Sequence, residues 1–163
     1  MNLPLSSQQR VEAALAAKGV SIDIKVFPAG TRTAADAAAA IGCQVAEIAK
    51  SIVLRAVSSD RVVVVVASGS NRVDEHKVAQ LLGEPLARAD ADFVRRKTGF
   101  AIGGVAPIGH LEAPLLLLDQ DLLQYEHVWA AAGTSDSVFR LTPAELQLLT
   151  DAPLADIKQE NKA

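Results

Sequence analysis

The amino-acid sequence predicts an α/β protein of the α+β type, in which a mixed β-sheet is surrounded by helices. Strand-like and helical segments are interspersed, but without the strict β-α-β order of a doubly wound sheet. Five consecutive valines at residues 62–66 indicate a strand buried on both faces. Half of the 163 residues are hydrophobic and only 4% are aromatic, so Ala, Val and Leu must fill the core. A chain of this length can bury a sizeable core, and we expect residues 1–163 to form one domain.

The composition also limits the function. The formal net charge is −3 and the pI about 5.6, which argues against a protein that coats DNA or duplex RNA by charge alone. Contact with one end of an RNA needs only a local patch and is compatible with this charge. The single cysteine, Cys43, excludes a disulfide framework. The first residues lack the apolar stretch of a signal peptide and no run is long enough to span a membrane, so we expect a soluble, cytoplasmic protein.

The first third of the chain predicts two helices and a strand. Ser6 and Gln9 have the spacing of a capping box, which predicts a helix that ends at Gly19. Apolar and polar residues alternate over residues 22–26, which is the period of a half-buried strand. Thr33 can cap a second helix, and Gly42 follows its end. One face of this helix is almost entirely alanine, so we expect it to pack closely on a flat surface.

The middle of the chain predicts a β-hairpin followed by two short helices. A helical piece over residues 45–49 leads through Lys50 into a strand over residues 52–57. A turn connects that strand to the valine-rich strand over residues 61–68. Helices are expected over residues 74–82, ended by Gly83, and over residues 92–97, capped by Asp90.

The last third predicts three more strands and a final helix. Apolar runs over residues 115–118 and 127–131 are typical of central strands, and residues 138–141 of a further strand. Thr142, Pro143 and Glu145 supply the cap, the first-turn proline and the capping-box acid of a helix that continues to Leu149.

The segment from Gly99 to His110 is the most informative part of the sequence. It contains four glycines and one proline among mostly apolar residues, so it cannot form an ordinary helix. Exposed backbone N–H groups in such a loop can bind a carbonyl oxygen, an oxyanion or a phosphate. The alternative is a tight bend between two strands. The spacing matches neither a Walker loop nor a dinucleotide-binding fingerprint.

Lys50 is a lone cation among apolar neighbours. Such a lysine either extends to the surface or lies at the wall of a pocket. The basic run Arg95, Arg96 and Lys97 directly precedes the glycine segment, and it is either a solvated face or a contact for a phosphate backbone. The three histidines lack metal-ligand spacing and Cys43 has no activating base beside it, so we expect neither a metal site nor thiol chemistry.

Three blocks of the sequence together resemble the signature of the YbaK/prolyl-tRNA synthetase-associated editing domain family. They are residues 31–42, residues 48–53 and residues 99–110, and the stretches 125–133 and 141–146 also fit. The resemblance extends over nearly the whole chain, roughly residues 11–158. It implies a mixed, barrel-like sheet surrounded by helices. It also implies an activity, because free-standing members of this family hydrolyse wrongly charged aminoacyl-tRNA.

The resemblance implies site residues position by position, with Lys50 as the signature lysine of the family. The implied catalytic residues are Lys50, Gly103 and Gly104, and the implied substrate-binding residues are Phe27, Thr31, Ser51, Pro107, Gly109, His110, Ala131 and Gly133. No cofactor is expected. Alanines precede Gly133 where the family's cysteinyl-tRNA(Pro) deacylase has a serine, and Val138 stands where it has an aspartate. The resemblance therefore does not carry that cysteine specificity over to this chain.

The function implied by the resemblance is trans-editing. The protein would hydrolyse the ester that joins a small wrong amino acid (Cys, Ala, Ser or Thr) to the 3′-terminal ribose of tRNA(Pro). That ester is already activated, so holding and polarising its carbonyl can suffice without a strong nucleophile. The expected partners are the acceptor end of mischarged tRNA and prolyl-tRNA synthetase. Two alternatives are a non-catalytic module that binds the acceptor end or a synthetase, and a hydrolase of small activated esters.

Overall fold

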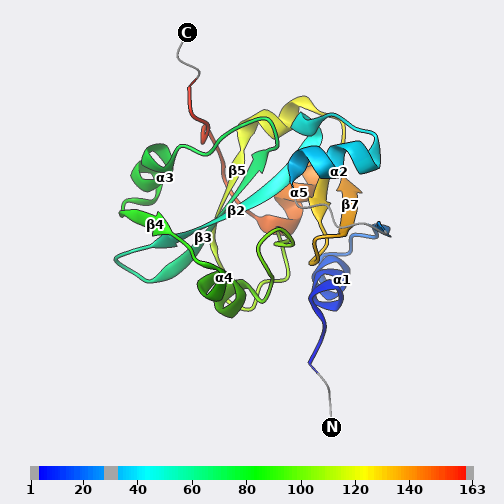
Figure 1. Ribbon diagram of the computed structural model, residues 1–163, viewed down its shortest axis with the longest axis horizontal. Coiled ribbons are helices and arrows are strands. Elements are labelled where there is room, and N and C mark those ends of the chain that lie inside the picture. Colours follow the sequence, from blue (N-terminus) through cyan, green and yellow to red (C-terminus); the bar gives the residue numbers. More distant parts are fainter. Residues whose placement is uncertain (1–3, 28–32, 161–163) are drawn as a thin grey trace.

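The computed structural model describes residues 4–27 and 33–160, and its centre is one mixed β-sheet (Figure 1). The strand order is β1-β7-β6-β2-β3-β5-β8, and β4 pairs with β2 outside this path. Parallel pairs, such as β3 with β5, occur beside antiparallel ones, such as β2 with β3, so the predicted mixed sheet is confirmed. The strands are β1 (Ile24–Val26), β2 (Ile48–Ala56), β3 (Arg61–Ser68), β4 (Leu86–Arg88), β5 (Leu115–Asp119), β6 (Val128–Ala131), β7 (Ser137–Leu141) and β8 (Leu154–Ala155).

Five α-helices surround this sheet in the described residues, and their limits follow the capping signals of the sequence. Ser6 and Gln9 form the predicted capping box of the first helix. Gly42 and Gly83 end the second and third helices with left-handed backbone. The helices are α1 (Ser7–Ala17), α2 (Ala34–Ile41), α3 (Glu75–Leu82), α4 (Ala91–Thr98) and α5 (Pro143–Thr150), with short 3-10 helices η1 (Val45–Glu47) and η2 (Gln120–Gln124). No helix in the described ranges is long and apolar enough to cross a membrane.

The valines of β3 bury both faces of the sheet, as the sequence predicts. Val62, Val64 and Val66 belong to the larger apolar cluster, which also contains side chains of α1, α4, α5 and β7. Val63 and Val65 belong to a second cluster on the other face, which includes Val78 of α3. All five valines are fully buried.

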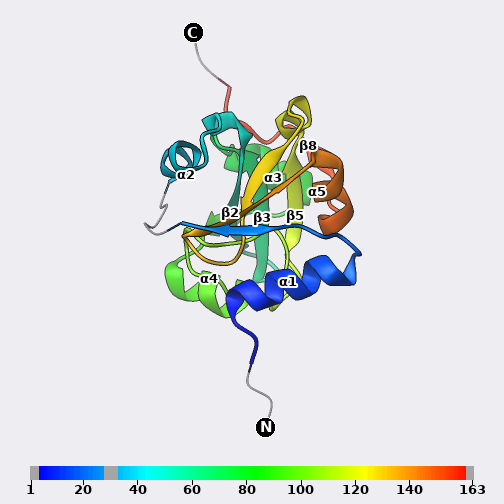
Figure 2. The same cartoon turned by 90° about the vertical axis from the view of Figure 1, so that its right-hand side faces the viewer.

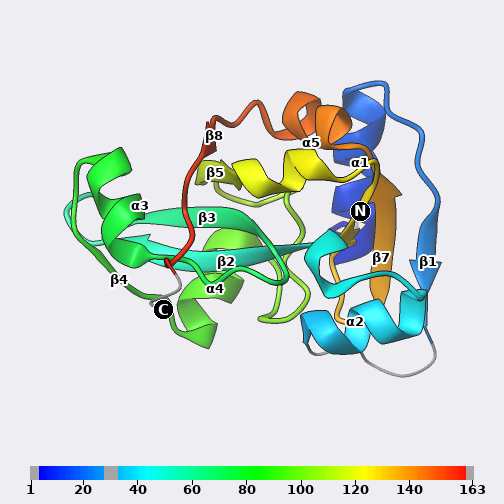
Figure 3. The same cartoon turned by 90° about the horizontal axis from the view of Figure 1, so that it is seen from above.

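The helices lie at different ends of the sheet. α3 and β4 lie at the end opposite β7 and α1, as two views agree (Figures 1 and 3). Figures 1 and 2 show α1 and α4 on the same side of the molecule. The glycine segment follows α4, and backbone hydrogen bonds from Leu111 and Glu112 to Thr98 and Lys97 close it into a loop.

Two details of the predicted elements need correction. η1 ends at Glu47 and β2 begins at Ile48, so Lys50 lies inside a strand and not in a transition from helix to strand. The physical reason is that Ile48 and Ala49 pair with β6, a contact across about eighty residues that local sequence does not encode. The short strands β4 and β8 were not predicted, because two or three residues carry no readable period.

Candidate active site

The outer edge of β2 has a gap in its strand pairing within the described chain. β6 pairs with its first two residues and β4 with its last three, which leaves residues 50–53 unpaired on that side. The Ile48 carbonyl accepts a hydrogen bond from Gly69 on the β3 side. In an antiparallel ladder the bonding direction alternates, so the backbone N–H and C=O groups of Ser51 and Val53 are directed toward the gap.

Two adjacent cavities border this gap. The first is about 320 Å³ in volume and has mostly apolar walls from α2, β2, β6 and β7. Its polar lining comes from Lys50 and from hydroxyl side chains, and none of its described lining residues is His, Cys, Asp or Glu. The lining residues are Thr33, Ala34, Ala37, Ile48, Ala49, Lys50, Ser51, Ile52, Ile102, Gly103, Val105, Trp129, Ala130, Ala131, Thr134, Ser135, Ser137 and Val138.

Lys50 lies on the wall shared by the two cavities. It pairs with Ala67 of β3, so a regular antiparallel ladder fixes its backbone. Its half-buried ammonium group makes neither an ion pair nor a hydrogen bond with any residue that the structure describes. Burial lowers the pKa of Lys50, the charge of Arg72 lowers it further, and Asp119 opposes both effects. An unpaired cation at a cavity wall can stabilise negative charge on a ligand.

Ser51 borders the same two cavities. Its Oγ atom is buried and has no hydrogen-bond partner in the described part of the chain. A buried hydroxyl without a partner costs about 1–3 kcal/mol. A bound ligand or water at the gap can satisfy it.

The glycine loop borders the cavities mainly through its first part, and Val105 is the one residue of its second part among their lining residues. Residues 101–103 are exposed, and Ile102 and Gly103 line both cavities. Gly103 has a φ of +91°, and a side chain added there would enter open space. Its N–H donates no hydrogen bond to a described residue. By contrast, the N–H of Gly104 donates to the Ala101 carbonyl at 2.9 Å, so it is already paired.

The second part of the loop packs against other backbone. A Cβ atom at Gly104 would lie 2.8 Å from the carbonyl carbon of Thr134, and one at Gly133 would lie 2.8 Å from that of Ser7. Arg10 of α1 contacts the glycine segment near both of its ends, because its guanidinium donates to the carbonyls of Gly99 and Gly109. Its charge also lies 5.0 Å from the centre of the Phe100 ring.

The predicted site residues therefore fall into two groups. The structure brings Lys50, Ser51, Gly103 and Ala131 together at the first cavity. Six others are not among the residues that line either of the two cavities: Phe27, Gly104, Pro107, Gly109, His110 and Gly133. Phe27 instead follows β1, where its N–H donates to the Asp136 carbonyl at 2.8 Å. Thr31 lies outside the described residues.

Sequence reasoning did not identify several cavity residues. Trp129 is the single tryptophan of the chain, and its ring also has the Lys25 ammonium 5.2 Å from its centre. Thr134 and Ser137 bring hydroxyl groups to the first cavity. The tryptophan could have been noticed as a rare residue within a predicted strand, whereas Thr134 and Ser137 carry no distinctive pattern.

The structure thus combines a mixed sheet surrounded by helices with a lysine and a glycine loop at one cavity. Residues 28–149 match the family profile of the aminoacyl-tRNA editing domain, and the chain belongs to that family. The resemblance drawn from the sequence is therefore confirmed.

Individual relatives agree with this family. The uncharacterised protein YwhH of Bacillus subtilis (strain 168) is 35% identical over 124 residues, which is 76% of this chain and 78% of that protein. A solved structure of a candidate trans-editing enzyme for prolyl-tRNA synthetase has 45% sequence identity and a TM-score of 0.89, over 96% of this chain and 100% of that one. A proline–tRNA ligase of Thermoanaerobacter sp. (strain X514) is 26% identical over 69% of this chain, which spans only 20% of the ligase.

Proposed function

We propose that this protein is a trans-editing deacylase that hydrolyses the ester of mischarged tRNA(Pro) carrying a small wrong amino acid. The observation that carries the proposal is the meeting of Lys50 and Gly103 at the gap in β2, between a small apolar cavity and a second cavity. The similarity to a candidate trans-editing enzyme for prolyl-tRNA synthetase and to a proline–tRNA ligase supports the choice of tRNA.

The first cavity is the place for the amino-acid side chain. Its walls include Ala34, Ala37, Ala130 and Ala131, which offer apolar contact without filling the space. Hydroxyl groups lie among its lining residues as well. Cys, Ala, Ser and Thr side chains are small enough for such a site. A second pocket of this kind is useful because initial binding separates small apolar side chains by only about 10–200-fold.

The chemistry is attack of water on the ester carbonyl carbon. The bond from that carbon to the ribose oxygen breaks, the ribose oxygen takes a proton, and a free amino acid and uncharged tRNA are released. The N–H of Gly103, which has no acceptor among the described residues, and the ammonium of Lys50 would stabilise the negative charge that develops on the carbonyl oxygen. No described residue lining the first cavity is a carboxylate or a histidine. The neighbouring ribose hydroxyl or the substrate side chain would therefore assist the proton transfer.

The test is single-turnover hydrolysis by purified protein of tRNA(Pro) charged with alanine, serine, cysteine, threonine or proline. We expect release of at least one of the four small wrong amino acids well above the uncatalysed rate, with proline spared. The same amino acids on an unrelated tRNA test how strictly tRNA(Pro) is required. Binding of charged tRNA without any hydrolysis would reject the enzyme and favour a non-catalytic module that binds the acceptor end.

A further inference from the structure

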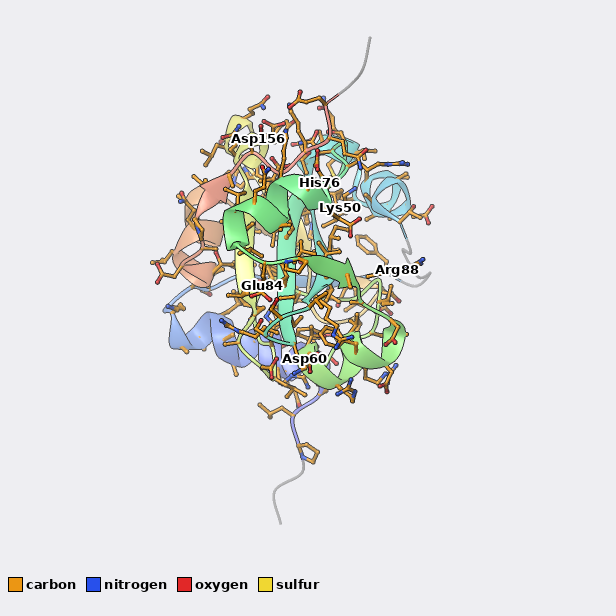
Figure 4. The ribbon with its side chains drawn as sticks, turned by 90° about the vertical axis from the view of Figure 1, so that its left-hand side faces the viewer. Lys50, Asp60, His76, Glu84, Arg88 and Asp156 are labelled. Atoms are coloured by element: carbon orange, nitrogen blue, oxygen red, sulfur yellow. The ribbon has the colours of Figure 1, made fainter. Side chains whose placement is uncertain are left out.

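The second cavity has a different character from the first. It is about 480 Å³ in volume and shares Lys50, Ser51 and Gly103 with the first cavity. Two arginines also line it: Arg72, which follows β3, and Arg88, the last residue of β4. Figure 4 views the molecule from this side and labels Lys50 and Arg88. Three cations from three separate segments therefore border one space.

Neither arginine has an acidic partner in the described residues. Arg72 and Arg88 are exposed and take part in no ion pair there, although Glu75 also lines the cavity. Elsewhere on the surface, Arg55 pairs with Asp60 at 2.7 Å between Nε and Oδ1. Unpaired like charges repel one another, and a bound anion relieves that repulsion.

The repulsion from Arg72 affects the pKa of Lys50. The charge of Arg72 is one of the two causes that lower the pKa of its ammonium. The buried carboxylate of Asp119 acts in the opposite direction, but it is held by hydrogen bonds from the Ser68 N–H and the Asn71 amide. An anion in the second cavity would offset the charge of Arg72 at Lys50.

Ile102 connects the two cavities. It lines both of them, and 62% of its surface is exposed. An exposed apolar side chain beside cations can pack against a nucleobase while the cations contact its phosphates. Every nucleobase has an apolar face, so this contact does not depend on the base sequence.

We propose that the second cavity binds the sugar-phosphate backbone of the RNA strand that leads to the esterified ribose, with Arg72 and Arg88 contacting its phosphates. This inference rests on the proposed function, since it places the ester at the shared wall and the aminoacyl group in the first cavity. Arginine suits this role because its planar fork donates two hydrogen bonds to a phosphate.

The assignment differs from the phosphate contact considered from the sequence, the basic run over residues 95–97. Two of its three residues have acidic partners in the structure. Arg96 pairs with Asp92 at 2.9 Å, and Lys97 pairs with Glu112 at 3.1 Å. The local sequence showed a cluster of positive charge but not the carboxylates that offset it.

The test compares two substrates that share the ester and differ in phosphate. One is charged tRNA(Pro), and the other is 3′-O-aminoacyl-adenosine, which has no phosphodiester. We expect Arg72→Ala and Arg88→Ala each to raise the KM for charged tRNA by roughly three- to tenfold and to leave hydrolysis of the nucleoside ester unchanged. Arg72→Lys and Arg88→Lys, which keep the charge, should recover part of the affinity.

Arg96→Ala is the matched control, because it removes one exposed arginine that is paired with an acid. It should leave both substrates unaffected. The inference is overturned if the Arg72 and Arg88 variants behave like this control, or if they lose activity equally on both substrates. Circular dichroism of each variant checks that the fold is retained.

A binding measurement separates this inference from the proposed hydrolysis. The probe is an uncharged single-stranded RNA with the sequence of the tRNA 3′ end, titrated at several salt concentrations. Each arginine removed should make the slope of log affinity against log salt shallower by about 0.7, the value for one phosphate contact on a single strand. If the wild-type protein hydrolyses nothing but this shift appears, the RNA site stands and the deacylase does not. If wild-type protein does not bind the RNA, the inference is wrong.

Discussion

The two parts of the glycine loop, residues 101–103 and residues 104–110, behave in opposite ways. The first part is exposed and borders both cavities at the gap in β2. The second part is largely buried and lines the cavities only through Val105, and its glycines approach the backbone of residues 134–135 and of α1. Glycine serves both parts, but for different reasons: a positive φ beside open space at Gly103, and lack of room for a side chain at Gly104.

This difference shows that a glycine-rich segment need not be one ligand loop. We call its second part, residues 104–110, the anchor, and Arg10 contacts the segment on both sides of the cavity part, at Gly99, Phe100 and Gly109. Changes at the cavity part should affect rate with little effect on folding. Changes in the anchor should affect stability first.

The largest expected effect is on the cavity side. Lys50→Met keeps most of the side-chain length but removes the charge, so the hydrolysis rate should fall by about 10²–10³ if Lys50 stabilises the transition state. The denaturant midpoint should stay close to that of the wild type, because Lys50 makes no ion pair with a described residue. Near-normal turnover by the folded variant would remove Lys50 from the mechanism.

Gly104→Val and Gly103→Ala test the boundary between the two parts. A valine at residue 104 would press its Cβ to within 2.8 Å of the Thr134 backbone, so we expect a loss of stability of about 3 kcal/mol in urea unfolding. An alanine at residue 103 meets open space and should cost about 1 kcal/mol, chiefly from its positive φ.

The effects on activity should follow the opposite order, with Gly103→Ala lowering the hydrolysis rate more than Gly104→Val. Measured on the folded fraction, Gly103→Ala should slow hydrolysis of every mischarged tRNA, because its side chain would project into the space near the reacting ester. Equal stability losses for the two variants would show that the loop does not divide at Gly103.

His110 gives the anchor a pH dependence. Burial lowers its pKa to about 4, a hydrogen bond to the Ala106 backbone opposes this, and the charge of Arg10 lowers it further. The unfolded chain therefore binds a proton near pH 6.5 that the folded chain rejects until about pH 4. The contribution of the neutral His110 to the free energy of unfolding is therefore fully present above pH 6.5. The free energy of unfolding should fall by about 2–3 kcal/mol as the pH drops toward 4.

The measurement is urea unfolding of wild type and His110→Gln between pH 4 and 7.5. Carboxylates titrate in both proteins, so the difference between the two curves isolates the histidine. A difference that does not change with pH would contradict the burial of a neutral imidazole.

A small effect on both stability and rate is expected for Arg10. Arg10→Ala removes hydrogen bonds to the carbonyls of Gly99 and Gly109 and the contact with the Phe100 ring, so it should destabilise the fold by about 1–2 kcal/mol. Arg10→Lys should recover only part of this, because one ammonium cannot reproduce the two-carbonyl contact. Well below the melting temperature, hydrolysis should stay within a few-fold of wild type. A large loss of rate without a loss of stability would place Arg10 at the substrate.

Local sequence predicted the helices well, because their ends are set by neighbouring residues. The capping boxes at Ser6 and Thr142 are formed as expected, and so are the caps at Thr33 and Asp90. The run of valines also correctly predicted that β3 is buried on both faces of the sheet. The start of β2 was missed because its partner β6 is distant in the sequence, and β4 and β8 were missed because they are too short for a readable period.

The candidate site divides in the same way. The sequence by itself determined the family and marked Lys50 and the glycine segment, because those residue types stand at the family's spacing. Only the tertiary structure decided which glycine borders the cavities, since that depends on whether Thr134 or open space faces each backbone position. Only the tertiary structure also showed that Arg72 and Arg88 line the same cavity as Lys50 while Arg96 pairs with Asp92, because a net charge is additive along the chain and a local field depends on distance.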